Sequence, residues 1–173
     1  MKLNNIFKLT LLVSLITLFM PRMHAQIQSA VAYLPENEGW LTSIDDAYAK
    51  SKKTGKPIMA NFTGSDWCGW CHKLSAAVFT QEDFKKWAAK NVILLELDYP
   101  RRKVIPANIQ QQNASLAQAF RITGYPTVWV FDLDKDSKSN QYSIKALGKT
   151  GYLPTVQEFV SGVDQMIARR TKV

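Results

Sequence analysis

The sequence predicts an α/β domain in which helices cover both faces of a central mixed sheet of about four to five strands. Segments with helical periodicity alternate with short apolar segments of strand length from residue 40 onward. Two consecutive strand-like segments, 126–134 and 141–148, flank a charged turn and predict a hairpin. The chain has 173 residues, 46% of them hydrophobic, which is enough for one domain with a buried core.

The first half of the domain is predicted to alternate helices with two strands. The apolar residues from Trp40 to Tyr48 recur at helical spacing. Thr42 or Ser43 is the expected cap of this helix, and Gly55 ends it. The following elements are a buried strand at 57–62, a turn at 63–66, a helix from the cysteines through Ala77, a helix capped by Thr80 and an apolar strand at 92–98.

The second half is predicted to contain a helix, the hairpin and a final helix. A loop at 99–108 leads into a helix at 109–120, and the two hairpin strands follow. Pro154 opens the last helix. The apolar face of this helix consists of Val156, Phe159, Val160, Val163 and Ile167.

The N-terminus has the features of a secretory signal peptide. Lys2 and Lys8 precede an apolar run of about a dozen residues, and Ala25 stands at the expected cleavage position. The run is short for a membrane span, which needs about 20 apolar residues, so we expect cleavage rather than an uncleaved anchor. We therefore expect residues 1–25 to be removed and the mature domain, 26–173, to be periplasmic or secreted, meeting the membrane only through the signal peptide.

The charge of the chain does not predict nucleic-acid binding. Removal of the signal peptide takes away three basic residues and lowers the formal net charge from +8 to +5. The remaining basic residues are scattered, and no basic helix face stands out.

Both cysteines lie in the stretch SDWCGWCHKL, residues 65–74. C-x-x-C is the spacing of a redox dithiol, and C-x-x-C-H is also the spacing at which c-type haem is attached. Because only two residues separate Cys68 from Cys71, a disulfide between them constrains little of the unfolded chain. Chemistry is therefore the expected reason for the pair.

The predicted helix start favours redox chemistry at these cysteines. The attacking sulfur must be a thiolate, and a helix N-terminus supplies unpaired N–H groups and partial positive charge that favour the anion. We predict Cys68 as the exposed nucleophile. Cys71, about one turn later, is the predicted buried thiol that attacks a mixed disulfide on Cys68. Trp67 and Trp70 would offer a flat apolar surface to a protein substrate.

Two segments together resemble the thioredoxin family. The sequence WCGWC, residues 67–71, follows an apolar strand, and GYPT, residues 124–127, precedes a later strand. The longer string TGKPIMANFTGSDWCGWCHKL is similar to exported bacterial thioredoxin-like proteins. The resemblance covers residues 40–170 and implies a three-layer α/β/α fold with a C-terminal hairpin and helix.

The resemblance also implies roles for individual residues. Cys68 matches the attacking cysteine, Cys71 the resolving cysteine, and Pro126 the proline that follows a cis peptide bond beside them. The backbone of Tyr125 would bind an extended substrate peptide. The substrate-binding residues implied in this way are Trp67, Gly69, Trp70, Tyr125 and Pro126. The redox group would be the Cys68–Cys71 disulfide itself, with no metal and no other cofactor.

Three residues are candidates for tuning the reaction. Thioredoxin has a buried aspartate that assists proton transfer, and the matching position here is Asn61, which cannot take a proton. Either water or Glu96 on the neighbouring strand would then do so. A charged His72 would favour a nearby thiolate, and the alternative is a surface residue without a role.

The segment after the second strand is longer than in thioredoxin. We place the insertion around 99–112, and it contains Arg101, Arg102 and Lys103. A solvated basic loop and a docking site for a partner are both compatible with this composition.

We therefore predict an exported thiol–disulfide oxidoreductase that exchanges disulfides with exported proteins. Reduction is the favoured direction, and the electron donor or acceptor is unidentified. One alternative is a non-catalytic module that holds a peptide at Tyr125–Pro126. The other is a haem protein with His72 as the axial ligand, which the strand-like segments and the GYPT sequence disfavour. Two cysteines and one histidine are one ligand short of a closed zinc site.

Overall fold

The computed structural model describes residues 33–170, and four strands within them form one mixed sheet. The strands are β1 (Ile58–Thr63), β2 (Ile93–Asp98), β3 (Thr127–Lys135) and β4 (Tyr142–Thr150), in the spatial order β2-β1-β3-β4. β1 runs parallel to β2 and antiparallel to β3, and β3 and β4 form the predicted hairpin. The predicted mixed sheet is confirmed, whereas the predicted signal peptide lies outside the described residues.

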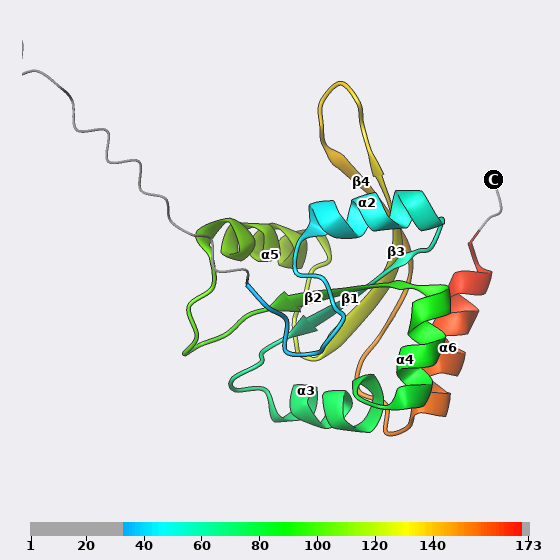
Figure 1. The fold of residues 1–173 in the computed structure, drawn as a ribbon. Coiled ribbons are helices and arrows are strands. Elements are labelled where there is room, and N and C mark those ends of the chain that lie inside the picture. Colours follow the sequence, from blue (N-terminus) through cyan, green and yellow to red (C-terminus); the bar gives the residue numbers. More distant parts are fainter. Residues whose placement is uncertain (1–32, 171–173) are drawn as a thin grey trace, which may run out of the picture. The chain divides into compact units, whose positions relative to one another are not determined.

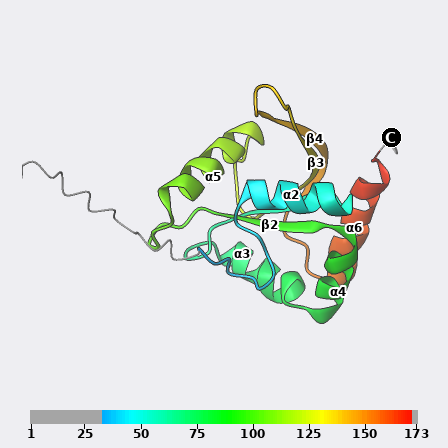
Figure 2. The same cartoon turned by 45° about the horizontal axis from the view of Figure 1, so that its top comes forward.

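Helices cover both faces of this sheet (Figure 1). They are α2 (Ile44–Thr54), α3 (Gly69–Leu74), the π-helical η1 (Ser75–Phe79), α4 (Glu82–Asn91), α5 (Ala107–Ala119) and α6 (Val156–Ala168). α2 and α5 lie over one face, and α3, η1, α4 and α6 lie over the other, as Figure 2 also shows. In the part of the chain described here, no helix is both long and apolar enough to cross a membrane.

Alternation along β1 decides which side chains face the helix that carries the cysteines. Ile58 and Phe62 enter the core beneath α2 and α5, whereas Met59 enters the core beneath η1, α4 and α6. Since successive side chains of a strand point to opposite faces, Asn61 lies on the same face as Met59. In the parallel register, Asn61 is paired with Glu96 of β2, so two polar side chains lie side by side there.

An aromatic cluster joins the helices on the α3 side of the sheet. The Phe79 ring lies 5.2 Å from that of Phe84 and 5.5 Å from that of Phe159, and Trp40 lies 4.8 Å from Phe79. Phe84 and Phe159 are fully buried. The cluster therefore holds η1, α4 and α6 together on the same side of the sheet as α3.

The ends of α2 follow the predicted signals. Ser43 Oγ accepts a hydrogen bond from the backbone N–H of Asp46, so Ser43 is the cap. Gly55 has φ of 71° and its N–H donates to Ser51, which is the left-handed ending that glycine allows at least cost.

Three local predictions are wrong. Pro154 does not open α6, because Thr155 is the N-cap and the helix begins at Val156. Trp40 precedes α2 rather than forming part of it, and its side chain packs from a loop into the aromatic cluster. Thr80 does not cap α4, because Gln81 holds that position. The Thr80 hydroxyl instead donates to the carbonyls of Ser75 and Ala76, which closes η1.

We predict that Phe84→Ala lowers the free energy of unfolding by about 3–5 kcal/mol, because it empties a buried aromatic site. Urea denaturation followed by circular dichroism measures this loss. Lys86→Ala, an exposed position on the same helix, should change the stability by about 0.5 kcal/mol or less. Equal effects of the two substitutions would contradict the role given to the aromatic cluster.

Candidate active site

The two cysteines form a disulfide at the start of α3. Their Cα atoms are 5.2 Å apart, and Cys68 is the N-cap residue of the helix. The backbone N–H of Cys71 donates to Cys68 Sγ at 3.2 Å, so the sulfur lies where the helix end favours negative charge, as predicted. The predicted difference in exposure is wrong for this disulfide form, because both cysteines are 5% exposed.

The turn before the cysteines is held by a carboxylate that sequence reasoning missed. Asp98, at the end of β2, accepts hydrogen bonds from the Ser65 backbone N–H at 2.8 Å and the Ser65 hydroxyl at 2.6 Å. The phenol of Tyr33 donates to the same carboxylate at 3.2 Å. Asp98 is 1% exposed. A charged residue ending a strongly apolar strand was the available signal, because a buried carboxylate needs partners.

Trp67 connects this turn to the loop before β3. Its indole N–H donates to the Tyr99 carbonyl at 2.8 Å, and its ring packs edge-on against Tyr125 at 5.6 Å. A Cβ at Gly64 would lie 2.4 Å from the indole, so only glycine leaves room for this packing. The Tyr125–Pro126 bond is cis, as the family resemblance implied. The structure therefore brings the WCGWC and GYPT segments together.

Trp70 is the exposed aromatic residue beside the disulfide. It is 55% exposed, its ring lies 5.0 Å from that of Tyr152, and the Lys73 ammonium lies 4.4 Å from its centre. Its neighbour Gly69 is the first residue of α3 and is also exposed. An exposed apolar ring flanking a reactive disulfide is a surface that a protein substrate can contact.

His72 is tied to the same turn. Its Nε2 lies 2.7 Å from the Ser65 carbonyl oxygen, and since a carbonyl only accepts, Nε2 carries the hydrogen. The nitrogen that would bind haem iron is therefore engaged, and the two sulfurs that would form thioethers are joined to each other. These contacts favour the dithiol interpretation of the motif over haem attachment.

The basic residues 101–103 are attached directly to the turn that precedes the cysteines. The Asp66 carboxylate accepts hydrogen bonds from the backbone N–H groups of Arg101, Arg102 and Lys103 at 2.6–2.9 Å. These bonds lower the pKa of Asp66 to about 2, and the bond from Arg101 has the largest effect. The Arg101 guanidinium also lies 3.8 Å from the centre of the Trp67 ring. The loop thus borders the site, and its use in docking a partner stays a prediction.

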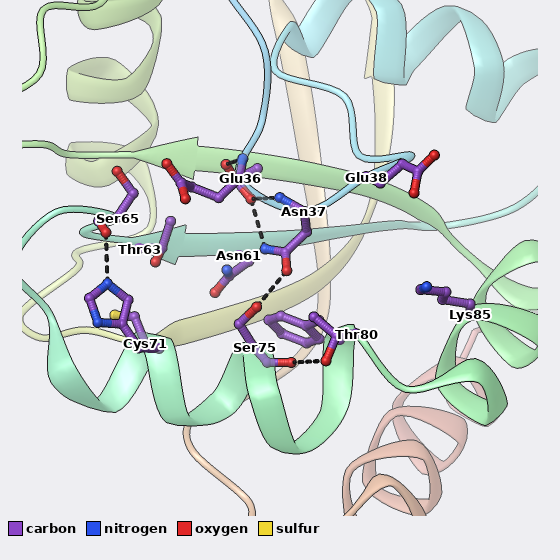
Figure 3. Close-up of a pocket in the computed structure, with 13 residues that line it drawn as sticks. Glu36, Asn37, Glu38, Asn61, Thr63, Ser65, Cys71, Ser75, Thr80 and Lys85 are labelled. Carbon is purple, nitrogen blue, oxygen red and sulfur yellow. Dashed lines mark hydrogen bonds between the residues drawn. The ribbon is translucent and has the colours of Figure 1, made fainter.

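A polar cavity of about 320 Å³ lies behind Cys71 (Figure 3). Its lining includes Cys71, Asn61 and Glu96, together with Asn37 from the segment before α2 and Ser75 from η1. Asn61 Oδ1 is buried and has no hydrogen-bond partner in the described part of the protein. The structure therefore groups the three predicted tuning residues, Asn61, His72 and Glu96, with the resolving cysteine. Trp67, Tyr125 and Pro126 do not line this cavity, and Trp67 packs against Tyr125 outside it.

Metal coordination has little support in the described range 33–170, where no group of three or more His, Cys, Asp or Glu residues is arranged to hold an ion. Of the titratable groups near the disulfide, His72 and Asp98 bond to Ser65, and Asp66 bonds to the backbone of the basic loop. The sulfur atoms are the redox-capable group of this site.

Comparison with known proteins assigns the architecture. Residues 39–132 match the family model described as thioredoxin-like. Among solved structures, the oxidoreductase DsbH superposes with a TM-score of 0.64 and 28% identity, covering 89% of this chain and 98% of that chain. The fold that the sequence predicted is therefore confirmed.

Curated relatives match a shorter region. The disulfide bond reductase DsbH of Chlamydia pneumoniae is 34% identical over 92 residues, which are 53% of this chain and 55% of that protein. The thioredoxin-related protein DsbJ of the same organism is 32% identical over 87 residues, 50% of this chain and 25% of its own length. The chain thus spans about half, or less, of the length of these relatives.

We predict that the amide protons of Arg101, Arg102 and Lys103 report the ionisation of Asp66. Because the folded-state pKa lies below that of an unfolded aspartate, about 3.9, the bonds persist above that pH and are lost as the pH falls through about 2. The amide chemical shifts, followed by NMR, should titrate with that midpoint.

Asp66→Asn should abolish this titration, whereas Asp136→Asn should leave it unchanged. Asp136 is the matched control because it also accepts backbone N–H bonds, in the β3–β4 turn. A midpoint near pH 4 in the wild type would contradict the assignment.

Proposed function

Because this chain belongs to the thioredoxin-like family, we propose that it is a thiol–disulfide oxidoreductase that acts on protein disulfides through Cys68 and Cys71. The observation that carries the proposal is the Cys68–Cys71 disulfide at the N-terminus of α3, with a backbone N–H aimed at Cys68 Sγ. The predicted signal peptide supports action on exported proteins outside the cytoplasm.

The reaction proceeds by thiol–disulfide exchange from the reduced protein. The Cys68 thiolate attacks a substrate disulfide, and one substrate sulfur leaves as a thiolate. The Cys71 sulfur then attacks Cys68 Sγ, the mixed disulfide breaks, and the second substrate thiolate leaves. Two electrons pass from the cysteine pair to the substrate, so the reaction needs no further cofactor.

The surroundings of the disulfide fit a protein substrate. Trp70 offers an exposed ring, and Tyr125 lies against Trp67 at the edge of the site. Proteins of this family are expected to bind an extended peptide through the main chain of the loop that corresponds to Tyr125–Pro126. Such recognition depends little on side chains, which supports a broad range of substrates.

Reduction of substrates is the proposed direction. The support comes from the curated relative in Chlamydia pneumoniae that is called a disulfide bond reductase. The Gly69–Trp70 dipeptide between the cysteines does not by itself fix the potential. Equilibration with glutathione measures it, and a value near about −270 mV supports a reductant, whereas about −120 mV supports an oxidant.

We predict that the wild-type protein accelerates the reduction of insulin by dithiothreitol and that Cys68→Ser reduces the rate to that of the uncatalysed reaction. Precipitation of the insulin B chain, followed by turbidity, measures the rate. Equal rates for wild type and Cys68→Ser would overturn the proposal and favour a peptide-binding module with a locked disulfide.

Cys71→Ser provides the matched variant. It retains the attacking sulfur but lacks the resolving one, so it should accumulate covalent complexes with insulin that dithiothreitol releases. Non-reducing electrophoresis detects these complexes. Their absence would contradict the assignment of Cys68 as the nucleophile.

A further inference from the structure

A carboxyl group that the proposed reaction does not yet use is buried behind the resolving cysteine. Glu96 is 1% exposed and is paired with Asn61 across the parallel strands β1 and β2. Both side chains lie on the face of the sheet that α3 covers, and both line the cavity that Cys71 also lines. A buried ionisable side chain is costly unless it is compensated, so its presence here calls for a chemical explanation.

The resolving step creates a need for a base at this place. Cys71 is a thiol before it attacks, and an ordinary thiol with a pKa of about 8.5 is mostly protonated at neutral pH. The amide of Asn61 cannot take the proton. Two other carboxyl groups line the cavity, Glu36 and Glu38, and both are exposed. Glu36 is further committed to an ion pair with Lys103.

Glu96 is held in a fixed position relative to the active-site helix. Its carboxylate accepts the backbone N–H of Glu36 at 2.7 Å and the side-chain amide of Asn37 at 3.0 Å. The amide oxygen of Asn37 in turn accepts the Ser75 hydroxyl at 2.5 Å. Since Ser75 lies one helical turn beyond Cys71, this chain of bonds fixes the distance between the carboxyl group and the helix.

The environment of Glu96 suits a proton acceptor. Burial raises the pKa of its carboxyl group above the ordinary value, and the bonds from Glu36 and Asn37 oppose this effect without cancelling it. A base is most effective when its pKa lies near the working pH. The charge of Asp98, on the same strand, raises the pKa further.

Water can connect the two groups. A cavity of about 320 Å³ has room for several water molecules, at about 30 Å³ each. The unpartnered Oδ1 belongs to Asn61, which lines the cavity, and Figure 3 shows this side chain between the labelled Cys71 and Asn37. A buried acceptor without a protein partner, in a polar cavity of this size, is a position for ordered water.

We propose that Glu96 accepts the proton of Cys71 through water in this cavity when Cys71 attacks the mixed disulfide. This inference rests on the proposed function. The Cys71 S–H bond breaks and its proton passes to the Glu96 carboxylate. The resulting thiolate forms the Cys68–Cys71 bond, the bond between Cys68 and the substrate breaks, and the substrate leaves as a thiolate. The carboxyl group later returns its proton to solvent.

Ellman's reagent separates the two steps in a stopped-flow experiment. The reduced protein releases one thionitrobenzoate when Cys68 attacks and a second when Cys71 resolves the mixed disulfide. For Glu96→Gln we expect the second release to slow by about 10²-fold at pH 7, with the first unchanged. This defect should shrink above about pH 8.5, because solvent then deprotonates the thiol directly.

The pH profile reports on Glu96 only if its charged surroundings are held constant. The other ionisable groups near it, besides Cys71, are Tyr33, Glu36, Glu38, His72, Lys85 and Asp98. Glu38→Gln is the matched control, since Figure 3 shows Glu38 at the end of the cavity away from Cys71. It should leave both releases and the pH profile as in the wild type.

A rescue experiment distinguishes proton transfer from a structural role. Asn61→Asp places a carboxyl group in the same cavity, so the double variant Asn61→Asp/Glu96→Gln should recover the second release. A loss caused by disturbed packing would not be repaired by an acid on another strand. Failure of this rescue, in a double variant that folds, would overturn the proposal.

The remaining outcomes are distinct. A folded Glu96→Gln variant with a wild-type second release would overturn the inference alone. A wild type that releases no second thionitrobenzoate would overturn the proposed function, and the inference with it. If Glu96→Gln does not fold, ¹³C NMR of the Glu96 carboxyl group in the wild type decides. A midpoint that differs between the oxidised and reduced forms supports the coupling to Cys71, and equal midpoints overturn it.

Discussion

The buried carboxylate of Asp98 holds the turn that carries the disulfide, and the rest of the site depends on it. It satisfies both the backbone N–H and the hydroxyl of Ser65, which lies three residues before Cys68. The side-chain amide of Asn113 donates to the Asp98 carbonyl, so α5 is attached to the same residue. Without the carboxylate, a buried N–H group would lose its partner, at a cost of about 1–3 kcal/mol. The sheet, the turn and α5 are therefore joined at one residue, the turn through its carboxylate and α5 through its backbone carbonyl.

Much of the fold was predictable because its signals are local. Hydrophobic periodicity and turn residues predicted the order of helices and strands, with boundaries that differ by no more than one residue at β1 and β2. The wrong assignments have different causes. A tertiary contact places Trp40 outside the helix, local hydrogen bonds occupy the Thr80 hydroxyl, and Thr155 rather than Pro154 caps α6. Trp40 enters the aromatic cluster from a loop, and Thr80 bonds backward to η1. No local pattern predicts a π-helical turn such as η1.

The candidate site was predictable only where a motif marks it. Cys68, Cys71 and the Tyr125–Pro126 pair stand in two short motifs whose combination is specific. The polar contacts around them join residues far apart in sequence, such as Ser65 with Asp98 and Asn37 with Glu96. The first contact depends on the register of β1 and β2, and the second on how the segment before α2 lies beside β2. A single sequence specifies neither. Glu96 could be named from its strand, but its hydrogen bonds and its place in the cavity could not.

The segment that precedes α2 forms part of the cavity wall, although it contributes neither a helix nor a strand. Glu36 and Asn37 supply the hydrogen bonds that hold Glu96, yet the family match begins only at residue 39. The smallest unit that keeps all the described helices and strands is therefore shorter than the smallest unit that keeps the site intact. A protein shortened to begin at the edge of the family match would keep the fold, but the cavity behind Cys71 would be open to solvent.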